Sequence, residues 1–198
     1  IGVLGETGRG IEEHFGLGDV IDIKMGTLSK TIPSVGGYVA GKKDLITYLR
    51  HASRSYIFSA ALPPAQAAAA NEAFKVILDE PERIEKLRAN GDQFISGLKE
   101  RGFDTLYTET AIVPVVRGAD ELPYAAARGR PARDGLVLAP GRPAARHTHR
   151  RPAYPLVSPA VPANLARLRA TVTAAHGPEE INHAMDIIET AGKKLGVI

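Results

Sequence analysis

The sequence predicts an α/β fold. Short runs of apolar and β-branched residues alternate along the chain with longer segments whose apolar residues recur every three or four positions, a pattern typical of strands alternating with helices. The 198 residues suffice for one large domain or two small ones, and 44% hydrophobic with 24% charged residues is ordinary for a globular protein. We expect a domain boundary near residue 81, followed by a smaller α/β domain at 82–198.

The first part of the chain is expected to combine two strands with two main helices. Its GETG run at 5–8 lacks the Lys-Ser/Thr of a Walker motif and is interpreted as a surface loop. Pro63 and Pro64 suit a turn followed by the first position of a helix. In order, the predicted elements are a helical turn at 11–15, strands at 20–25 and 37–40, an amphipathic helix at 42–53, an extended piece at 55–59 and a helix at 65–78.

The second part is expected to begin with a long helix and end with another. Gly102 is a natural C-terminal stop for the first, and Pro178, followed by two glutamates, marks the start of the last. The predicted elements are a helix at 82–101, a strand at 111–116, a short helix at 120–127, strands at 136–138 and 168–173, and a final helix from 178.

Composition excludes several classes of protein. There are no cysteines, so neither disulfides nor a thiolate metal site can form, and we expect no metal site. No apolar run approaches the roughly 18 residues of a membrane helix, and no signal peptide is visible, so we expect no membrane partner and a cytoplasmic protein. The chain begins with Ile1 in the middle of a pattern, and we expect it to be the C-terminal part of a longer protein.

The basic charge of the chain is concentrated in one stretch. Seven arginines and a single aspartate lie between 128 and 151, which gives this stretch +6 and leaves the rest of the chain at −3 of a total of +3. Such a stretch could bind nucleic acid, but no aromatic residues interleave with its charges for base stacking. We therefore expect residues 126–155 to be an insertion, or a segment translated from a shifted reading frame, and no nucleic-acid partner.

The stretch that carries chemistry is residues 22–41, DIKMGTLSKTIPSVGGYVAG. Lys30 follows the end of a predicted strand and is flanked by the hydroxyls of Thr27 and Ser29. A lysine forms a Schiff base with an aldehyde only when its amine is neutral, so we expect a partly desolvated setting in a cleft. The hydroxyls would bind an anionic group such as the phosphate of pyridoxal 5′-phosphate, and Gly36 and Gly37 would let backbone pass close to a flat ring.

Three ordered motifs resemble those of the α-oxoamine synthases, which are fold-type I pyridoxal-phosphate enzymes. They are GTLSKTIPSVGGYVAG at 26–41, YIFSAALPPAQAAAA at 56–70 and RLRATVTAAHGPEEI at 167–181. The resemblance implies that 1–81 belongs to the C-terminal part of a large cofactor-binding domain of the aminotransferase type, and that 82–198 is the small α/β domain.

The resemblance also implies roles for individual residues. Lys30 matches the lysine that binds the cofactor covalently and later moves the α-proton of the substrate, and Thr27 matches a phosphate-binding threonine. Ser59 matches a residue that reaches the cofactor phosphate of a neighbouring subunit, which implies a homodimer with shared sites. Arg169 matches the arginine that grips the substrate carboxylate. Ala60 and Ala160 stand where some members carry hydroxyl residues, so those contacts are expected to be missing.

The implied activity is a biosynthetic acyl transfer: decarboxylative condensation of an amino acid with an acyl thioester, either acyl-CoA or an acyl-carrier protein, to an α-amino ketone. The family's ring-nitrogen aspartate and ring-stacking histidine lie upstream of Ile1 and are missing, so we expect the chain alone to be inactive or nearly so. Two alternatives stay open. One is an aminotransferase of the same fold, and the other is a catalytically incomplete remnant or non-catalytic subunit.

Overall fold

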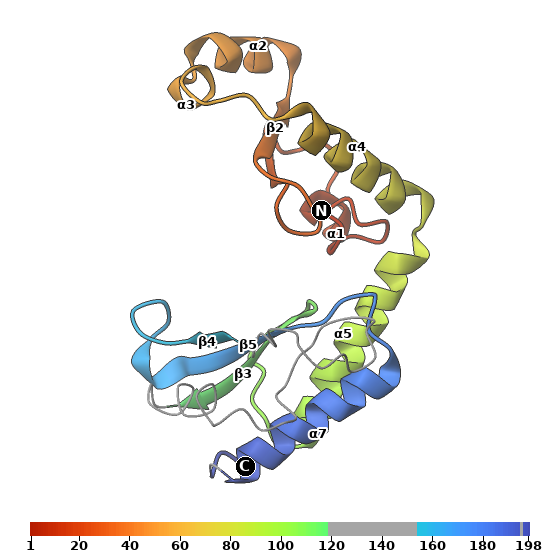
Figure 1. Ribbon diagram of the computed structural model, residues 1–198, viewed down its shortest axis with the longest axis vertical. Coiled ribbons are helices and arrows are strands. Elements are labelled where there is room, and N and C mark those ends of the chain that lie inside the picture. The colour runs from red at the N-terminus through yellow and green to blue at the C-terminus, as the bar shows by residue number, and fades with distance from the viewer. Residues whose placement is uncertain (119–153, 195) are drawn as a thin grey trace. The chain divides into compact units, whose positions relative to one another are not determined.

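The computed structural model describes residues 1–118, 154–194 and 196–198 and divides into two compact units, Ile1–Glu85 and Lys86–Ile198 (Figure 1). None of the helices in these described ranges is both long and apolar enough to cross a membrane. The predicted helix at 120–127, the predicted strand at 136–138 and nearly all of the segment 126–155 lie outside the described residues.

The first unit combines one antiparallel hairpin with four helices. The helices are α1 (Ile11–His14), α2 (Lys43–Ala52), α3 (Arg54–Ile57) and α4 (Pro64–Asp79), and the hairpin strands are β1 (Ile23–Thr27) and β2 (Gly37–Gly41). The two strands pair in register, with Gly26 opposite Tyr38 and Thr27 opposite Gly37. The hairpin therefore places residues 28–36 as the connection between its strands.

The buried core of the first unit is formed where this connection packs on α4. Leu28 and Ile32 of the connection are buried against Ala70 of α4, and the partly buried Tyr38, Ala73, Phe74 and Ile77 surround them. The rings of Tyr38 and Phe74 meet edge to face, with centroids 5.9 Å apart. Burial of these apolar side chains is the main force that fixes the connection on the helix.

Two glutamates of α1 organise the glycine-rich start of the chain. The Glu13 carboxylate accepts hydrogen bonds from the backbone N–H groups of Thr7 and Arg9 (3.1 and 2.9 Å), so the amides of this loop are used internally. Glu12 accepts the N–H groups of Val20 and Ile21 (3.2 and 3.1 Å). Because those two amides bond to a side chain, the first strand begins at residue 23 and not at 20, where the sequence pattern placed it.

Residues 55–59 do not form the extended piece that their apolar character predicted. The backbone turns instead into the short helix α3, whose residue Ile57 donates its N–H to the Ser53 carbonyl (3.0 Å), as Phe58 does to Arg54 (3.0 Å). A short apolar run fits a single helical turn as well as a strand, because its length is too small for periodicity to decide.

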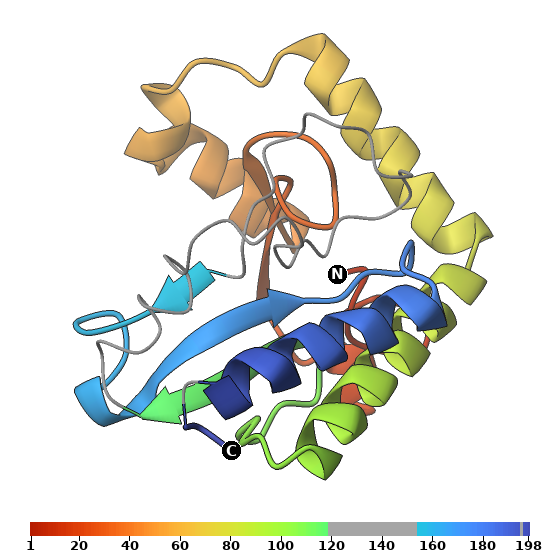
Figure 2. The same cartoon turned by 60° about the horizontal axis from the view of Figure 1, so that its bottom comes forward.

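The second unit is a two-layer α/β arrangement. Its elements within the described residues are α5 (Glu82–Glu100, which begins just before the boundary), β3 (Ile112–Gly118), β4 (Tyr154–Leu156), a 3₁₀ turn η1 (Ala163–Leu165), β5 (Ala166–Thr171) and α7 (Pro178–Lys194). The strands form an antiparallel sheet in the order β3-β5-β4, and α5 and α7 cover one face of it (Figure 2).

The core of the second unit lies between the sheet and the two helices. Phe94 and Leu98 of α5 and Ile181 of α7 are completely buried there, together with Val113 of β3 and Val172, which follows β5. Strand alternation places every second residue of β3 and β5 in this core. The α/β character that the sequence predicted is thus present in the packing of this unit.

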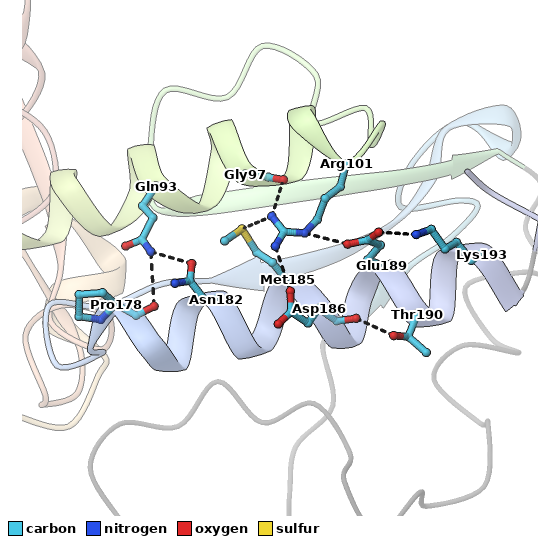
Figure 3. A network of polar contacts seen from close by, with 10 residues as sticks. All are labelled: Gln93, Gly97, Arg101, Pro178, Asn182, Met185, Asp186, Glu189, Thr190 and Lys193. Carbon is cyan, nitrogen blue, oxygen red and sulfur yellow. Dashed lines mark hydrogen bonds and ion pairs between the residues drawn. The ribbon is translucent and has the colours of Figure 1, made fainter.

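A polar network joins α5 to α7 on the side of the helices away from the sheet (Figure 3). Arg101, one residue beyond α5, donates to Glu189 (3.0 Å) and Asp186 (2.9 Å) of α7 and to the Gly97 carbonyl (3.0 Å). The helices approach closely at Gly97, where an added Cβ would lie 2.8 Å from the terminal methyl carbon of Met185. A side chain at this crossing would therefore have to displace the end of the Met185 side chain.

Strand β5 spans residues 166–171, whereas the pattern predicted 168–173. The chain leaves the strand because Thr173 donates its N–H to Nδ1 of His176 (3.0 Å) instead of to a neighbouring strand. The Asn90 amide of α5 then donates to the carbonyls of Thr173 and His176 (2.9 and 3.0 Å). These bonds fix the turn that leads into α7.

Candidate functional site

Lys30 lies in the middle of the connection between β1 and β2, and its backbone is held from both sides. Leu28, two residues before it, and Ile32, two residues after it, are both buried against α4. The Leu28 N–H donates to the Gly36 carbonyl (2.9 Å), and the Ser34 N–H donates to the Leu28 carbonyl (2.9 Å), which closes the loop. Lys30 itself is exposed. Lys30 is therefore an exposed residue between two buried anchors.

Two hydroxyl groups accompany the lysine at the end of β1. The hydroxyls of Thr27 and Ser29 are 3.1 Å apart and share a hydrogen bond, and the Thr27 hydroxyl also lies 3.4 Å from the Gly36 carbonyl. Both residues are exposed. The arrangement places two O–H donors within one and three residues of the lysine, which is a donor set suited to an anionic group next to an aldehyde.

The desolvated cleft expected around Lys30 is not present in the first unit. Thr27, Ser29 and Lys30 are all exposed, whereas Leu28 and Ile32 between and after them are buried against α4. The structure thus provides the lysine and the hydroxyls, and residues 1–85 do not enclose them.

The neighbouring lysine in the strand, Lys24, has a different environment. Its ammonium group pairs with Asp19 and Glu12, each at 2.7 Å, and these two hydrogen bonds raise the pKa of Lys24 above its ordinary value. A lysine held in this way stays protonated and cannot act as a nucleophile. Lys24 borders an open pocket of about 330 Å³ lined by Asp19, Ile21, Asp22, Ala40, Gly41 and Lys42. Because both carboxylates bind its ammonium group, this lysine serves ion pairing and not covalent chemistry.

The remaining predicted residues lie apart from Lys30 in the chain. Ser59 and Ala60 are exposed in the segment between α3 and α4, in the same unit as the lysine. Arg169 is exposed on β5 of the second unit, where it pairs with Pro114 of β3 and Tyr154 of β4. Thr27 at the end of β1 and Ser29 and Lys30 of the connection thus lie within four consecutive residues, while Arg169 belongs to the other unit.

Arg169 differs clearly from Arg167, which lies on the same face of β5. Nε of Arg167 donates to the Leu165 carbonyl (2.8 Å), and its side chain is half-buried. Arg169 is exposed on the sheet face opposite to α5 and α7, since Leu168 and Ala170 turn toward the core. Of the two arginines, Arg169 is therefore the more exposed. Within the described ranges, no three histidine, cysteine or acidic residues gather in a way that could hold a metal ion.

Sequence reasoning missed the residues that support the loop. Ser34 donates its hydroxyl to the Gln66 carbonyl of α4 (2.8 Å), and Tyr38 covers Gly26 across the hairpin. The four-residue spacing of Leu28 and Ile32 around Lys30 is a signal that could have indicated two anchors. Nothing in the sequence indicated that Ser34 meets a helix that begins thirty residues later.

Comparison with known proteins identifies the class of protein. The chain belongs to the family described as aminotransferase class I and II, whose family model matches residues 2–188. More particularly, it is 44% identical over 197 residues to the 8-amino-7-oxononanoate synthase of Thermoanaerobacter pseudethanolicus, and 40% identical over 197 residues to that of Treponema denticola. Each comparison covers 100% of this chain and 46% of the relative. The chain thus spans about half the length of the curated relatives it matches.

A solved structure gives the same result for the fold. The serine palmitoyltransferase of S. paucimobilis, determined with a bound PLP-myriocin aldimine, superposes with a TM-score of 0.83 at 29% identity, over 100% of this chain and 46% of that one. The predicted resemblance to the α-oxoamine synthases and the predicted fold class are confirmed by these relatives. The roles of Lys30, Thr27, Ser59 and Arg169 stay predictions.

Proposed function

We propose that this chain is part of a pyridoxal-phosphate-dependent acyltransferase that condenses an amino acid with an acyl thioester, releasing carbon dioxide and forming an α-amino ketone. The observation that carries the proposal is the closed loop that presents Lys30 beside the hydroxyls of Thr27 and Ser29. Relatives named 8-amino-7-oxononanoate synthase, at 40–44% identity, support the reaction class.

The residues present fit the cofactor. Lys30 would hold its aldehyde carbon covalently, and the hydroxyls of Thr27 and Ser29 would donate to its phosphate in place of the hydrogen bond they share with each other. When bound, pyridoxal phosphate supplies an electron sink for the carbanion of the amino acid. When it is not bound to the cofactor, Nζ of Lys30 would be the base that accepts the α-proton of the amino acid.

Arg169 would orient the substrate. A guanidinium group offers two parallel N–H donors to a carboxylate, and the exposed Arg169 has this geometry available while Arg167 is bonded to the backbone. Substituting Arg169 by alanine should raise KM for the amino acid about 10- to 100-fold, and lysine should restore little of the loss because it lacks the planar fork. An unchanged KM would exclude this role.

We propose a homodimer with shared sites and the domain division near residue 81. The segment around Ser59 carries exposed aromatic residues, with Tyr56 at 64% and Phe58 at 79% exposure, and such a surface is suited to burial against a second copy of the chain. Ser59 would then reach the phosphate of the neighbouring site. Residues 1–81 would form part of the cofactor-binding domain, and residues 82–198 the small domain, of a soluble cytoplasmic enzyme.

The test is formation of a visible absorption band when pyridoxal phosphate is added to the full-length protein that contains this chain. The band should be abolished by Lys30→Ala and kept by Lys75→Ala, a matched control whose lysine is exposed on α4 of the same unit and pairs with Glu72. A parent protein without a band would overturn the proposal and favour a non-catalytic remnant.

Product analysis then separates the two enzyme classes. An amino acid with acyl-CoA or an acyl-carrier thioester should release carbon dioxide and free thiol. Exchange of the amino group with a keto acid, without use of the thioester, would favour an aminotransferase, the alternative that the family description also admits.

A further inference from the structure

The loop that carries Lys30 is bound to helix α4 by two kinds of contact. Leu28 and Ile32 are apolar anchors on the helix, and burial of apolar surface is non-directional. Ser34 adds a directional contact: its hydroxyl donates to the backbone carbonyl of Gln66 (2.8 Å) and lies 3.1 Å from Oε1 of the same residue. Ser34 and Gln66 are both half-buried.

Ser34 is also the residue that closes the loop. Its N–H donates to the carbonyls of Leu28 (2.9 Å) and Ile32 (3.0 Å), on either side of the lysine. One residue therefore holds the loop closed through its backbone and ties it to the helix through its side chain. A shift of Ser34 relative to α4 would move Lys30 with it.

Gln66 provides a rigid acceptor for this bond. It lies in the first turn of α4, where its N–H donates to the Pro63 carbonyl (2.9 Å), and proline at this position fixes the entry of the chain into the helix. The segment with Ser59 leads directly into the same turn. The Ser34–Gln66 contact thus joins the Lys30 loop to the start of the helix that follows Ser59.

We propose that Ser34 and Gln66 are positioning residues that hold the Lys30 loop at a fixed place on α4. The proposal rests on the proposed function for its chemical consequence, since Lys30 must meet the aldehyde of a cofactor whose phosphate is bound at Thr27. A catalytic group that shifts by about 1 Å loses a large part of its efficiency. The side-chain hydroxyl of Ser34 is the element that this positioning requires.

Three variants test the proposal in a graded way. Ser34→Ala removes the hydroxyl, Ser34→Thr keeps a hydroxyl, and Gln66→Ala removes the side-chain acceptor but keeps the carbonyl. A matched control is Ser96→Ala in the second unit, whose hydroxyl also donates to a helix carbonyl, that of Asp92 (2.7 Å). The control loses the same kind of bond without any link to Lys30.

The first measurement is amide hydrogen exchange of residues 28–36 in the full-length protein without cofactor. Exchange in Ser34→Ala should be about fivefold to tenfold faster, the change expected from the loss of one ordinary hydrogen bond. Gln66→Ala should be intermediate, and Ser34→Thr and Ser96→Ala should match the parent. Parent-like exchange in Ser34→Ala would overturn the proposal.

The second measurement is the dissociation constant of pyridoxal phosphate, read from its visible band. Ser34→Ala should weaken binding about fivefold to tenfold, with rescue by Ser34→Thr, while the thermal unfolding midpoint of the second unit stays unchanged. Faster exchange with unchanged affinity would overturn the positioning role. Absence of a band in the parent would overturn the proposed function instead, and the exchange result would still decide whether Ser34 holds the loop.

Discussion

Substitution of Gly26 by alanine tests the packing beneath the lysine loop. Gly26 lies on β1 directly opposite Tyr38 of β2, and a Cβ added to it would lie 2.5 Å from the Tyr38 hydroxyl oxygen and closer still to two ring carbons. Ordinary contact between such atoms begins at about 3.5 Å, so the ring must move by about 1 Å. The ring is packed edge to face on Phe74 and cannot swing freely into solvent.

The expected magnitude follows from two opposing effects. Overpacking of a well-packed site costs about 1–3 kcal/mol, and part of the aromatic pair, worth about 0.5–1.5 kcal/mol, is lost when the ring shifts. Alanine regains about 0.5–1 kcal/mol because a strand glycine loses more backbone entropy on folding. We expect Gly26→Ala to lower the free energy of unfolding of the first unit by about 1–2 kcal/mol.

The assay is chemical denaturation followed by circular dichroism, with the tyrosine signal in the near ultraviolet reporting on Tyr38. Gly18→Ala is the matched control, because no atom lies within 4 Å of a Cβ placed there and its backbone needs no positive φ. The control should be neutral or slightly stabilising. If Gly26→Ala behaves like Gly18→Ala, the Tyr38 ring is not confined by Phe74 and the reasoning is refuted.

Three further predictions concern the rest of the fold. Arg101→Met removes the guanidinium that joins α5 to two carboxylates of α7, and should lower the free energy of unfolding of the second unit by about 1–2 kcal/mol in denaturant titrations. Thr105→Val should raise this free energy by about 1 kcal/mol, because the buried Thr105 hydroxyl has no hydrogen-bond partner within the described part of the chain. Acid should loosen the N-terminal loop. The hydrogen bond from the Thr7 hydroxyl, and after it those from backbone N–H groups, lower the pKa of Glu13. The stabilising effect of the ionised Glu13 carboxylate is therefore present above about pH 4.5 and is lost as the pH falls through the lowered pKa. Amide exchange of residues 5–10 should therefore speed up in acid.

Each of these predictions has a contrary outcome. Lys75→Met, which removes an exposed pair on α4, should change stability by less than about 0.5 kcal/mol, and an equally small effect for Arg101→Met would show that the network adds nothing net. A destabilised Thr105→Val would show that the hydroxyl has a partner. A Glu13→Gln variant that keeps the parent's acid dependence would assign the effect to other carboxylates.

The long helices could be predicted from the sequence because prolines and glycine mark their ends. Pro64 and Pro178 occupy the first positions of α4 and α7, and Gly102 follows the end of α5, so these helices lie within two residues of the predicted bounds wherever a bound was given. Strand bounds were less accurate because they depend on hydrogen bonds with distant partners. Glu12 takes the amides that would have begun β1, and His176 takes the one that would have extended β5.

The candidate site was only partly predictable. Spacing alone indicated a lysine with two nearby hydroxyls, and the structure places Thr27 at the end of β1 and the other two residues in the connection that follows. The spacing of the residues could not show that Lys30 is exposed, because its exposure depends on how Leu28 and Ile32 pack on a helix more than thirty residues away. The Ser34–Gln66 contact likewise could not be predicted from local patterns, because the two residues are 32 positions apart in the chain.

The two methionines of the chain differ completely in their surroundings. Met25 of β1 is 78% exposed, while Met185 is 2% exposed at the crossing of α5 and α7. A thioether in solvent is oxidised readily by peroxide, whereas one packed against Gly97 is protected until the helices separate. Each unit therefore carries one natural chemical reporter, and mass spectrometry after brief peroxide treatment would read the opening of the second unit against an internal standard in the first.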